Sequence, residues 1–127
     1  MRDDLDALEA QSIYILREAY SRIRPLAMLW SLGKDSNVMI WLAKKAFLGR
    51  VPFPVAHLDT GLEFPETYAF RDRYAREWGL ELIKDPCPPL EATDRTQPHN
   101  SRIAARKTLG LKEAIVKYES KGVIAGI

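Results

Sequence analysis

The sequence predicts an α/β domain built on an open parallel sheet in three layers, with helices on both faces. Short apolar runs of strand length alternate with longer segments in which apolar residues recur every three or four positions. Glycine or proline stands at most of the boundaries between them. Strands that alternate with helices are typical of parallel sheets with right-handed crossovers. With 127 residues, 46% of them hydrophobic, we expect one domain over residues 1–127.

The first part of the chain predicts a helix, a strand and a second helix. Apolar residues at helical spacing over residues 3–23 predict an amphipathic helix, which Pro25 ends. Residues 26–30 form a continuous apolar run, which is typical of a strand buried on both faces. A tight turn over residues 31–36 then leads into a helix that ends before Gly49.

The rest of the chain repeats this pattern. Residues 55–58 predict a second strand, and Pro65 suits the first turn of a helix that runs up to Gly79. We further expect a third strand at 80–83, a long loop over 85–100, a helix from about 101 or 108 to 120, and a fourth strand within 122–127. The tryptophans Trp30, Trp41 and Trp78 are expected in the core.

Charge and cysteine content narrow the classes of function. Nineteen basic against seventeen acidic residues leave a net charge of +2, spread along the chain, so we expect neither a nucleic-acid partner nor a membrane partner. The single cysteine, Cys87, excludes an internal disulfide, and we expect no zinc site and no iron–sulfur cluster. The acidic N-terminus is unlike a signal peptide, and no stretch reaches the roughly 18 apolar residues of a membrane span. We therefore expect a cytoplasmic protein.

The turn between the first strand and the second helix, SLGKDS, has the chemistry of a phosphate-binding loop. Gly33 permits a tight turn, and the N–H groups that begin the helix face an anion with the positive end of the helix dipole. Ser31 and Ser36 add hydroxyl donors, Lys34 adds a cation, and Asp35 has the carboxylate that a magnesium ion needs. The alternative from residues alone is an ordinary turn in which Asp35 or Ser36 caps the helix.

A Walker phosphate loop is excluded, because Met28 and Asp35 stand where that motif needs a glycine and a Ser or Thr. The loop instead resembles the S-x-G-K-D-S pyrophosphate loop of adenine-nucleotide alpha-hydrolase-like enzymes. It is most similar to the branch with the sulfate adenylyltransferase small subunits, which lies beside the phosphoadenylyl-sulfate reductases. HLDTGLEFPETYAFRDRYAREWG, RKTLGLKEAIVKY and GVIAGI continue the likeness in the family's order over nearly all of the chain.

The resemblance implies a set of site residues. Lys34 and Asp35 would serve the reaction directly, with Mg²⁺ bound near Asp35 together with ATP. The implied nucleotide-binding residues are Ser31, Leu32, Gly33, Lys34, Asp35, Ser36, Asp59, Thr60, Gly61 and Lys107.

The residues alone leave other roles open around these positions. Asp59 is equally suited to cap a turn, and His57 is better interpreted as a buried histidine with satisfied hydrogen bonds. We interpret the remaining polar residues of this region as solvated surface charges, namely Glu63, Arg71, Asp72, Arg73 and Arg102.

The resemblance implies adenylyl transfer from ATP to sulfate, or to a similar oxyanion, with release of pyrophosphate and with a larger GTP-hydrolysing partner subunit. The first alternative is reduction of adenylyl sulfate or phosphoadenylyl sulfate, which needs a nucleophilic thiol. Cys87, in a proline-rich loop, is a poor candidate for that thiol. A further alternative is a nucleotide-binding module without turnover.

The sequence stops at Ile127, at the end of a predicted strand. Ligands of open parallel sheets bind beyond such strand ends, so we expect this chain to be the N-terminal part of a longer family domain.

Overall fold

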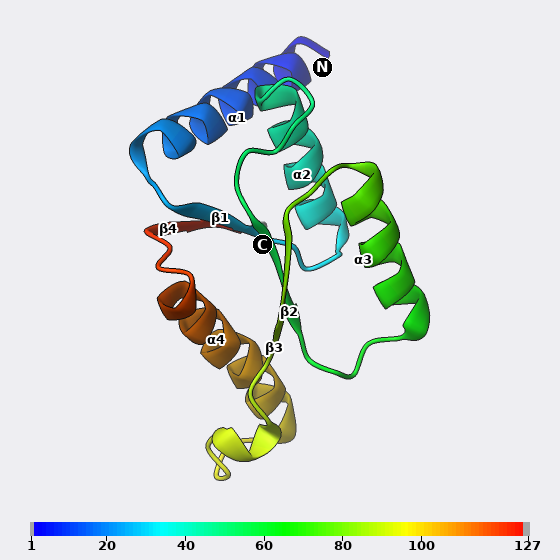
Figure 1. Ribbon diagram of the computed structural model, residues 1–127, viewed down its shortest axis with the longest axis vertical. Helices are drawn as coiled ribbons and strands as arrows, with labels where there is room; N and C mark the ends of the chain where they lie inside the picture. Colours follow the sequence, from blue (N-terminus) through cyan, green and yellow to red (C-terminus); the bar gives the residue numbers. More distant parts are fainter. Residues whose placement is uncertain (1, 126–127) are drawn as a thin grey trace.

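A computed structural model describes residues 2–125, which form four strands and four α-helices in alternating order (Figure 1). The elements are α1 (Arg2–Arg22), β1 (Leu26–Leu29), α2 (Lys34–Ala46), β2 (Val55–Asp59), α3 (Pro65–Glu77), β3 (Leu82–Pro86), a 3₁₀ turn (Leu90–Ala92), α4 (His99–Lys117) and β4 (Gly122–Ile124).

The four strands form one parallel sheet in the order β3-β2-β1-β4. Met28 of β1 lies opposite Val55 of β2, and Ala56 lies opposite Ile83 of β3. The two central strands, β1 and β2, are neighbours: β1 ends at Leu29, opposite Ala56, and β2 runs on to Asp59. The loops that follow them, residues 31–33 and 60–64, meet at the same edge of the sheet, where parallel sheets bind ligands.

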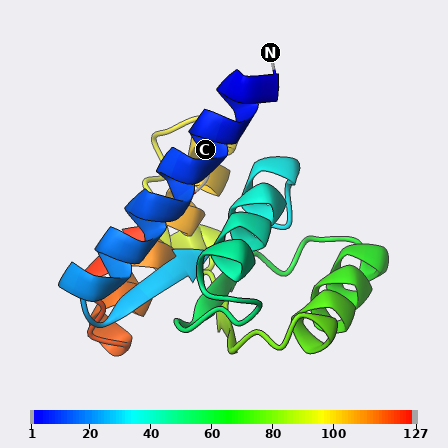
Figure 2. The ribbon, with the colours of Figure 1, turned by 90° about the horizontal axis from the view of Figure 1, so that it is seen from above.

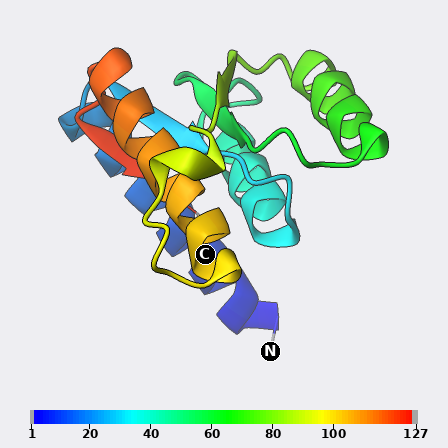
Figure 3. The same cartoon turned by 90° about the horizontal axis from the view of Figure 1, so that it is seen from below.

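Helices cover both faces of this sheet, as the sequence predicts. Helices α1 and α2 pack together on one face, and α3 lies beside α2 on that side. Helix α4 lies against β2 and β3 on the opposite face (Figures 2 and 3). The main cluster of buried apolar residues lies between the sheet and the first group of helices. Its fully buried members include Met28, Trp30, Ile40, Ala43, Phe53 and Val55.

Several predicted boundaries move. Strand β3 runs on to Pro86, into the predicted loop, and α4 ends at Lys117 rather than at residue 120. Strand β3 begins at Leu82 rather than at Leu80, because Leu80 N–H donates to the carbonyl of Ala75 and Gly79 has a φ of +61°. These are the features of a turn that ends a helix, so Leu80 belongs to the end of α3. Helix α4 begins at His99, directly after Pro98, which shortens the predicted loop.

The expectation for Trp41 is wrong. Its side chain is 51% exposed on the outer face of α2, where the ammonium of Lys45 lies 4.5 Å from the ring centroid. Trp30 is buried and Trp78 is partly buried against it, as expected. The fourth strand is confirmed for residues 122–124, and the part of that prediction on residues 126–127 lies outside the described residues. No helix within residues 2–125 combines the length and apolar character that crossing a membrane requires.

Candidate functional site

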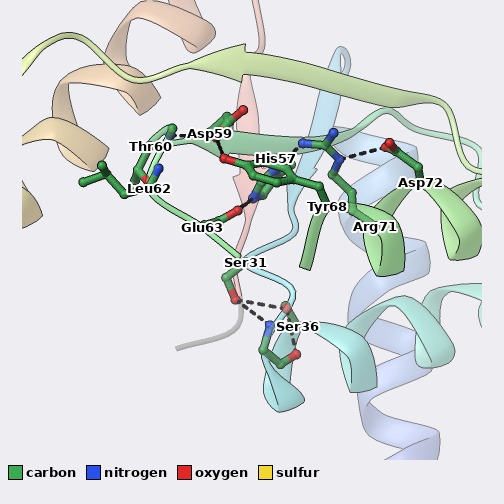
Figure 4. A network of polar contacts seen from close by, with 12 residues as sticks. Ser31, Ser36, His57, Asp59, Thr60, Leu62, Glu63, Tyr68, Arg71 and Asp72 are labelled. Atoms are coloured by element: carbon green, nitrogen blue, oxygen red, sulfur yellow. Dashed lines mark hydrogen bonds and ion pairs between the residues drawn. The ribbon is translucent and has the colours of Figure 1, made fainter. Parts of the chain in front are cut away.

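The loop after β1 is held in shape by its own two serines (Figure 4). Ser31 donates to Ser36 Oγ at 3.0 Å, and Ser36 donates in turn to the carbonyl of Gly33 at 3.0 Å. The carbonyl of Gly33 also accepts the first helical bond of α2, from Asn37 N–H at 3.0 Å. Leu32 has a φ of +67°, a left-handed conformation that costs a leucine about 1–2 kcal/mol. Such strain is retained where the surrounding structure fixes it, which occurs most often at functional sites.

The charged residues of this loop face solvent. Lys34 and Asp35 are exposed in the first turn of α2, and neither forms an ion pair with any residue of the described part of the chain. Gly33 occupies the N-cap position with an extended backbone and no capping side chain. The first N–H groups of a helix lack partners within the helix. This loop therefore presents a lysine and backbone donors to an incoming anion.

A pocket of about 210 Å³ opens beside this loop, between the ends of β1 and β2 and the middle of α4. It brings Ser31 and Lys107 together from opposite ends of the sequence. Its full lining is Leu29, Trp30, Ser31, Ala56, His57, Leu58, Glu63, Lys107, Thr108 and Leu111. Leu32 and Lys34 instead line an open groove between α2 and the first turns of α3.

The residues after β2 form a closed turn. Asp59 Oδ1 accepts hydrogen bonds from Gly61 N–H at 2.8 Å and from the hydroxyl of Tyr68, and Gly61 has a φ of +77°. Partial burial raises the pKa of Asp59, but the bonds from Tyr68 and Gly61 and the charge of Arg71 outweigh it and hold the pKa below its ordinary value. Asp59 is thus a turn-capping carboxylate that stays ionised.

A buried network of hydrogen-bonded polar side chains lies next to this turn (Figure 4). His57 is 1% exposed, and its Nδ1 lies 3.0 Å from Arg71 Nη1. An arginine always donates, so Nδ1 accepts and the proton of the neutral ring is on Nε2. Nε2 then donates to Glu63 Oε1 at 3.4 Å, while Oε2 lies 3.1 Å from this nitrogen and accepts no hydrogen bond from the described residues. Arg71 is fixed in turn by Asp72, whose Oδ1 accepts from Nε at 2.9 Å. The interpretation of His57 as a satisfied histidine is confirmed.

The interpretation of Arg71 as a surface charge is wrong, since the residue is only 6% exposed. The signal that could have found it is its spacing. Tyr68, Arg71 and Ala75 recur at three and four positions, which places Arg71 on the face of α3 that packs against the sheet. Glu63 is likewise not a surface charge, because it lines the pocket and its side chain is 23% exposed.

Two adjacent basic residues in the middle of α4, Arg106 and Lys107, have different environments. Arg106 is buried and donates from Nε to the carbonyl of Pro88 and from Nη2 to the carbonyl of Thr60, each at 2.8 Å. Arg106 thereby ties α4 to the turn after β2, whereas Lys107 is exposed on the pocket. Arg102, predicted as a solvated charge, also has a structural contact, because it donates to Leu90 O and Thr93 Oγ1.

Among the carboxylates of the site, Asp35 is the one best suited to bind Mg²⁺. This cation prefers oxygen ligands and usually takes one or two carboxylates together with substrate phosphates. Asp35 is exposed next to the candidate phosphate loop, while one oxygen of Asp59 already accepts two hydrogen bonds. Residues 2–125 hold no cluster of three or more His, Cys, Asp or Glu side chains that would bind a metal by themselves. The residues present therefore fit a magnesium ion bound jointly with phosphates.

Comparison with solved structures supports the fold. The phosphoadenylyl-sulfate reductase of Candida auris superposes with a TM-score of 0.69 at 17% identity, covering all of this chain and 68% of that one. A U34-tRNA thiolase from Methanococcus maripaludis superposes with a TM-score of 0.66 at 18% identity, over 95% of this chain and 46% of that one.

Comparison of sequences identifies the family. Sulfate adenylyltransferase subunit 2 of Salmonella arizonae is 45% identical over 126 residues, which cover 96% of this chain and 42% of that protein. The same subunit of Proteus mirabilis is 45% identical over 127 residues, with the same coverage. The chain thus spans less than half the length of these relatives. The model of the phosphoadenosine phosphosulfate reductase domain matches residues 25–127, and the chain belongs to this family.

Proposed function

We propose that this chain binds ATP with its phosphates over residues 31–36, and that the protein transfers the adenylyl group of ATP to sulfate. The observation that carries the proposal is the position of the pocket. It opens next to a strand-to-helix loop with exposed backbone donors and a lysine without an ion pair among the described residues. A nucleoside in the pocket would have its phosphates on that loop.

The proposed reaction needs positioning and charge neutralisation rather than a nucleophilic side chain. A sulfate oxygen attacks the α-phosphorus of ATP, the bond from the α-phosphorus to the bridging oxygen breaks, and pyrophosphate leaves with that electron pair. Lys34 and the N–H groups of the first turn of α2 hold the leaving pyrophosphate. Asp35 would hold Mg²⁺, which would supply charge neutralisation to the phosphates. Lys107 lies at the rim of the pocket, where it suits the incoming anion.

Two relatives named sulfate adenylyltransferase subunit 2 support this reaction over the alternatives. The name of these relatives supports a partner subunit, which we propose to be larger and GTP-hydrolysing, and we further propose a cytoplasmic location. Reduction of a sulfonucleotide, which the family model favours, would need a reactive thiol. Cys87 does not suit that role, because it is buried and its burial raises the pKa of the thiol.

The test is calorimetric titration of the chain with ATP and with adenylyl sulfate, each with and without Mg²⁺, together with an assay for sulfate-dependent pyrophosphate release. We expect magnesium-dependent binding of ATP. Pyrophosphate release would establish the transfer reaction. Binding of adenylyl sulfate without binding of ATP would favour the reductase alternative, and binding of neither nucleotide would overturn the proposal.

A further inference from the structure

The pocket between β1, β2 and α4 has an apolar interior and a polar rim. The buried or half-buried lining residues are mostly apolar, whereas Ser31, Lys107 and Thr108 are exposed. Its volume of about 210 Å³ is smaller than the roughly 300–1,000 Å³ of pockets that enclose a whole drug-sized ligand. One heterocyclic base therefore fits the interior, and the sugar and phosphates of a nucleotide would lie over the rim.

One acidic side chain, that of Glu63, lines this pocket and is intermediate in exposure between the interior and the rim residues. Glu63 lines the pocket and its side chain is 23% exposed, while its Oε2 is buried and has no hydrogen-bond partner among the described residues. No cation of Lys or Arg lies within ion-pair distance of it among the described residues. A half-buried carboxylate without such a cation needs further hydrogen-bond donors.

A hydrogen bond from His57, which Arg71 orients, fixes the position of the Glu63 carboxylate. Arg71 donates to Nδ1 of His57, so that Nε2 carries the proton and donates to the carboxylate of Glu63. The imidazole is 1% exposed and held on both nitrogens, so its ring is not free to turn away. His57 thereby occupies one acceptor site of the carboxylate, on Oε1, and the side chain lines the pocket with further acceptor capacity.

We propose that Glu63 is a specificity-determining residue that accepts hydrogen bonds from the ribose hydroxyls of the bound nucleotide. Carboxylates bind ribose hydroxyls in the same way at the strand ends of other nucleotide-binding α/β folds. The assignment to the ribose follows from the pocket, because the apolar interior takes the base and Glu63 stands where the sugar emerges. This inference rests on the proposed binding of ATP and adds the group by which the nucleoside is selected.

The test is calorimetry on the wild-type chain and on Glu63→Gln with four ligands: ATP, 2′-deoxy-ATP, 3′-deoxy-ATP and ITP. Glutamine keeps an oxygen that accepts from His57 Nε2, and urea denaturation checks that the fold is retained. Hydrogen bonds to charged groups are strong enough that we expect Glu63→Gln to weaken ATP binding about 10- to 100-fold. Glu77→Gln is the matched control, because it removes an exposed carboxylate from the far end of α3 and should leave the affinity unchanged.

The analogues decide where the carboxylate acts. We expect the wild type to lose a similar factor with at least one deoxy analogue, and Glu63→Gln to lose nothing further with that analogue. Equal binding of ATP and both deoxy analogues by the wild type would overturn the inference without any variant. It would also be overturned if Glu63→Gln kept the full penalty for the deoxy analogues, or if the variant abolished discrimination against ITP instead. A wild type that binds no nucleotide would show that the proposed function itself fails.

Discussion

The two loops at the ends of β1 and β2 are neighbours, yet the charged residues of the first are exposed, whereas a histidine and an arginine beside the second are buried. After β1, Lys34 and Asp35 are exposed and make no ion pair within residues 2–125. Along and after β2, His57 and Arg71 are buried and bonded to each other. Charges that are buried and bonded contribute to folding, whereas charges left in water are available for a ligand. Stability and binding should therefore be separable by mutation in these two loops.

The largest expected effect is on stability, at Arg71. Arg71→Ala leaves Nδ1 of the buried His57 without its donor and leaves Asp72 with its ion pair to Lys84 alone. Loss of one partner from a buried charged network typically costs about 3–5 kcal/mol, and because Asp72 is half exposed we expect a loss near the lower figure. Urea denaturation followed by circular dichroism measures this change in the free energy of unfolding.

Arg73→Ala is the control for that experiment, since Arg73 is exposed on the same helix, where it pairs with Glu77 and lies 5.3 Å from the ring centroid of Tyr74. A surface pair of this kind contributes about 0.3–0.5 kcal/mol. If both variants lost the same small amount of unfolding free energy, the buried polar network beside β2 would not stabilise the fold, and the contrast between the loops would fail.

The opposite result is expected at Lys34 and Asp35. Replacing either residue by alanine should change the free energy of unfolding by less than about 0.5 kcal/mol, because both side chains are exposed. The affinity for magnesium-bound ATP should fall at least about tenfold, since charge-assisted contacts to phosphate are lost. Calorimetry and urea denaturation on the same samples measure both quantities. Unchanged affinity in both variants would remove this loop from the site.

The periodicity of the sequence was sufficient for the fold, because each strand and helix carries its own apolar pattern and its own boundary residues. It was less informative about the site, because function there depends on which groups become buried. Glu63 and Arg71 look like ordinary surface charges in the sequence, and only the packing of α3 on the sheet encloses them. Arg106 and Lys107 look like an ordinary basic pair in the sequence, but in the fold Arg106 points inward from α4 and Lys107 lines the pocket.

A smaller effect is expected at the end of α2, away from both loops. Leu48 is 93% exposed with a φ of +58°, so its side chain adds strain without burying apolar surface. Leu48→Gly should stabilise the protein by about 0.5–1 kcal/mol, because glycine adopts this conformation freely and is favoured directly after a helix. Gln11→Gly, at an exposed position within α1, should destabilise by about 1 kcal/mol. Thermal and urea denaturation measure both changes, and a change of the same sign in the two variants would contradict the reasoning.

The smallest expected effect is a pH dependence that reports on the turn after β2. Since the pKa of Asp59 is held below its ordinary value of 3.8 in the folded protein, its contribution to stability is present above pH 3.8 and is lost as the pH falls through the folded pKa. Tyr68→Phe removes one of the hydrogen bonds that lower this pKa. The variant should therefore lose less stability than the wild type between about pH 5 and pH 3.

Asp72 and Asp94 also have lowered pKa values in the folded protein, so the wild-type slope alone does not isolate Asp59. The difference between the wild type and Tyr68→Phe does isolate it, because Asp94 and Asp72 keep their hydrogen bonds to Thr96 and Arg71. Urea denaturation at intervals across this pH range gives the two slopes. Parallel slopes would mean that the hydrogen bond from Tyr68 does not hold Asp59 in its ionised form.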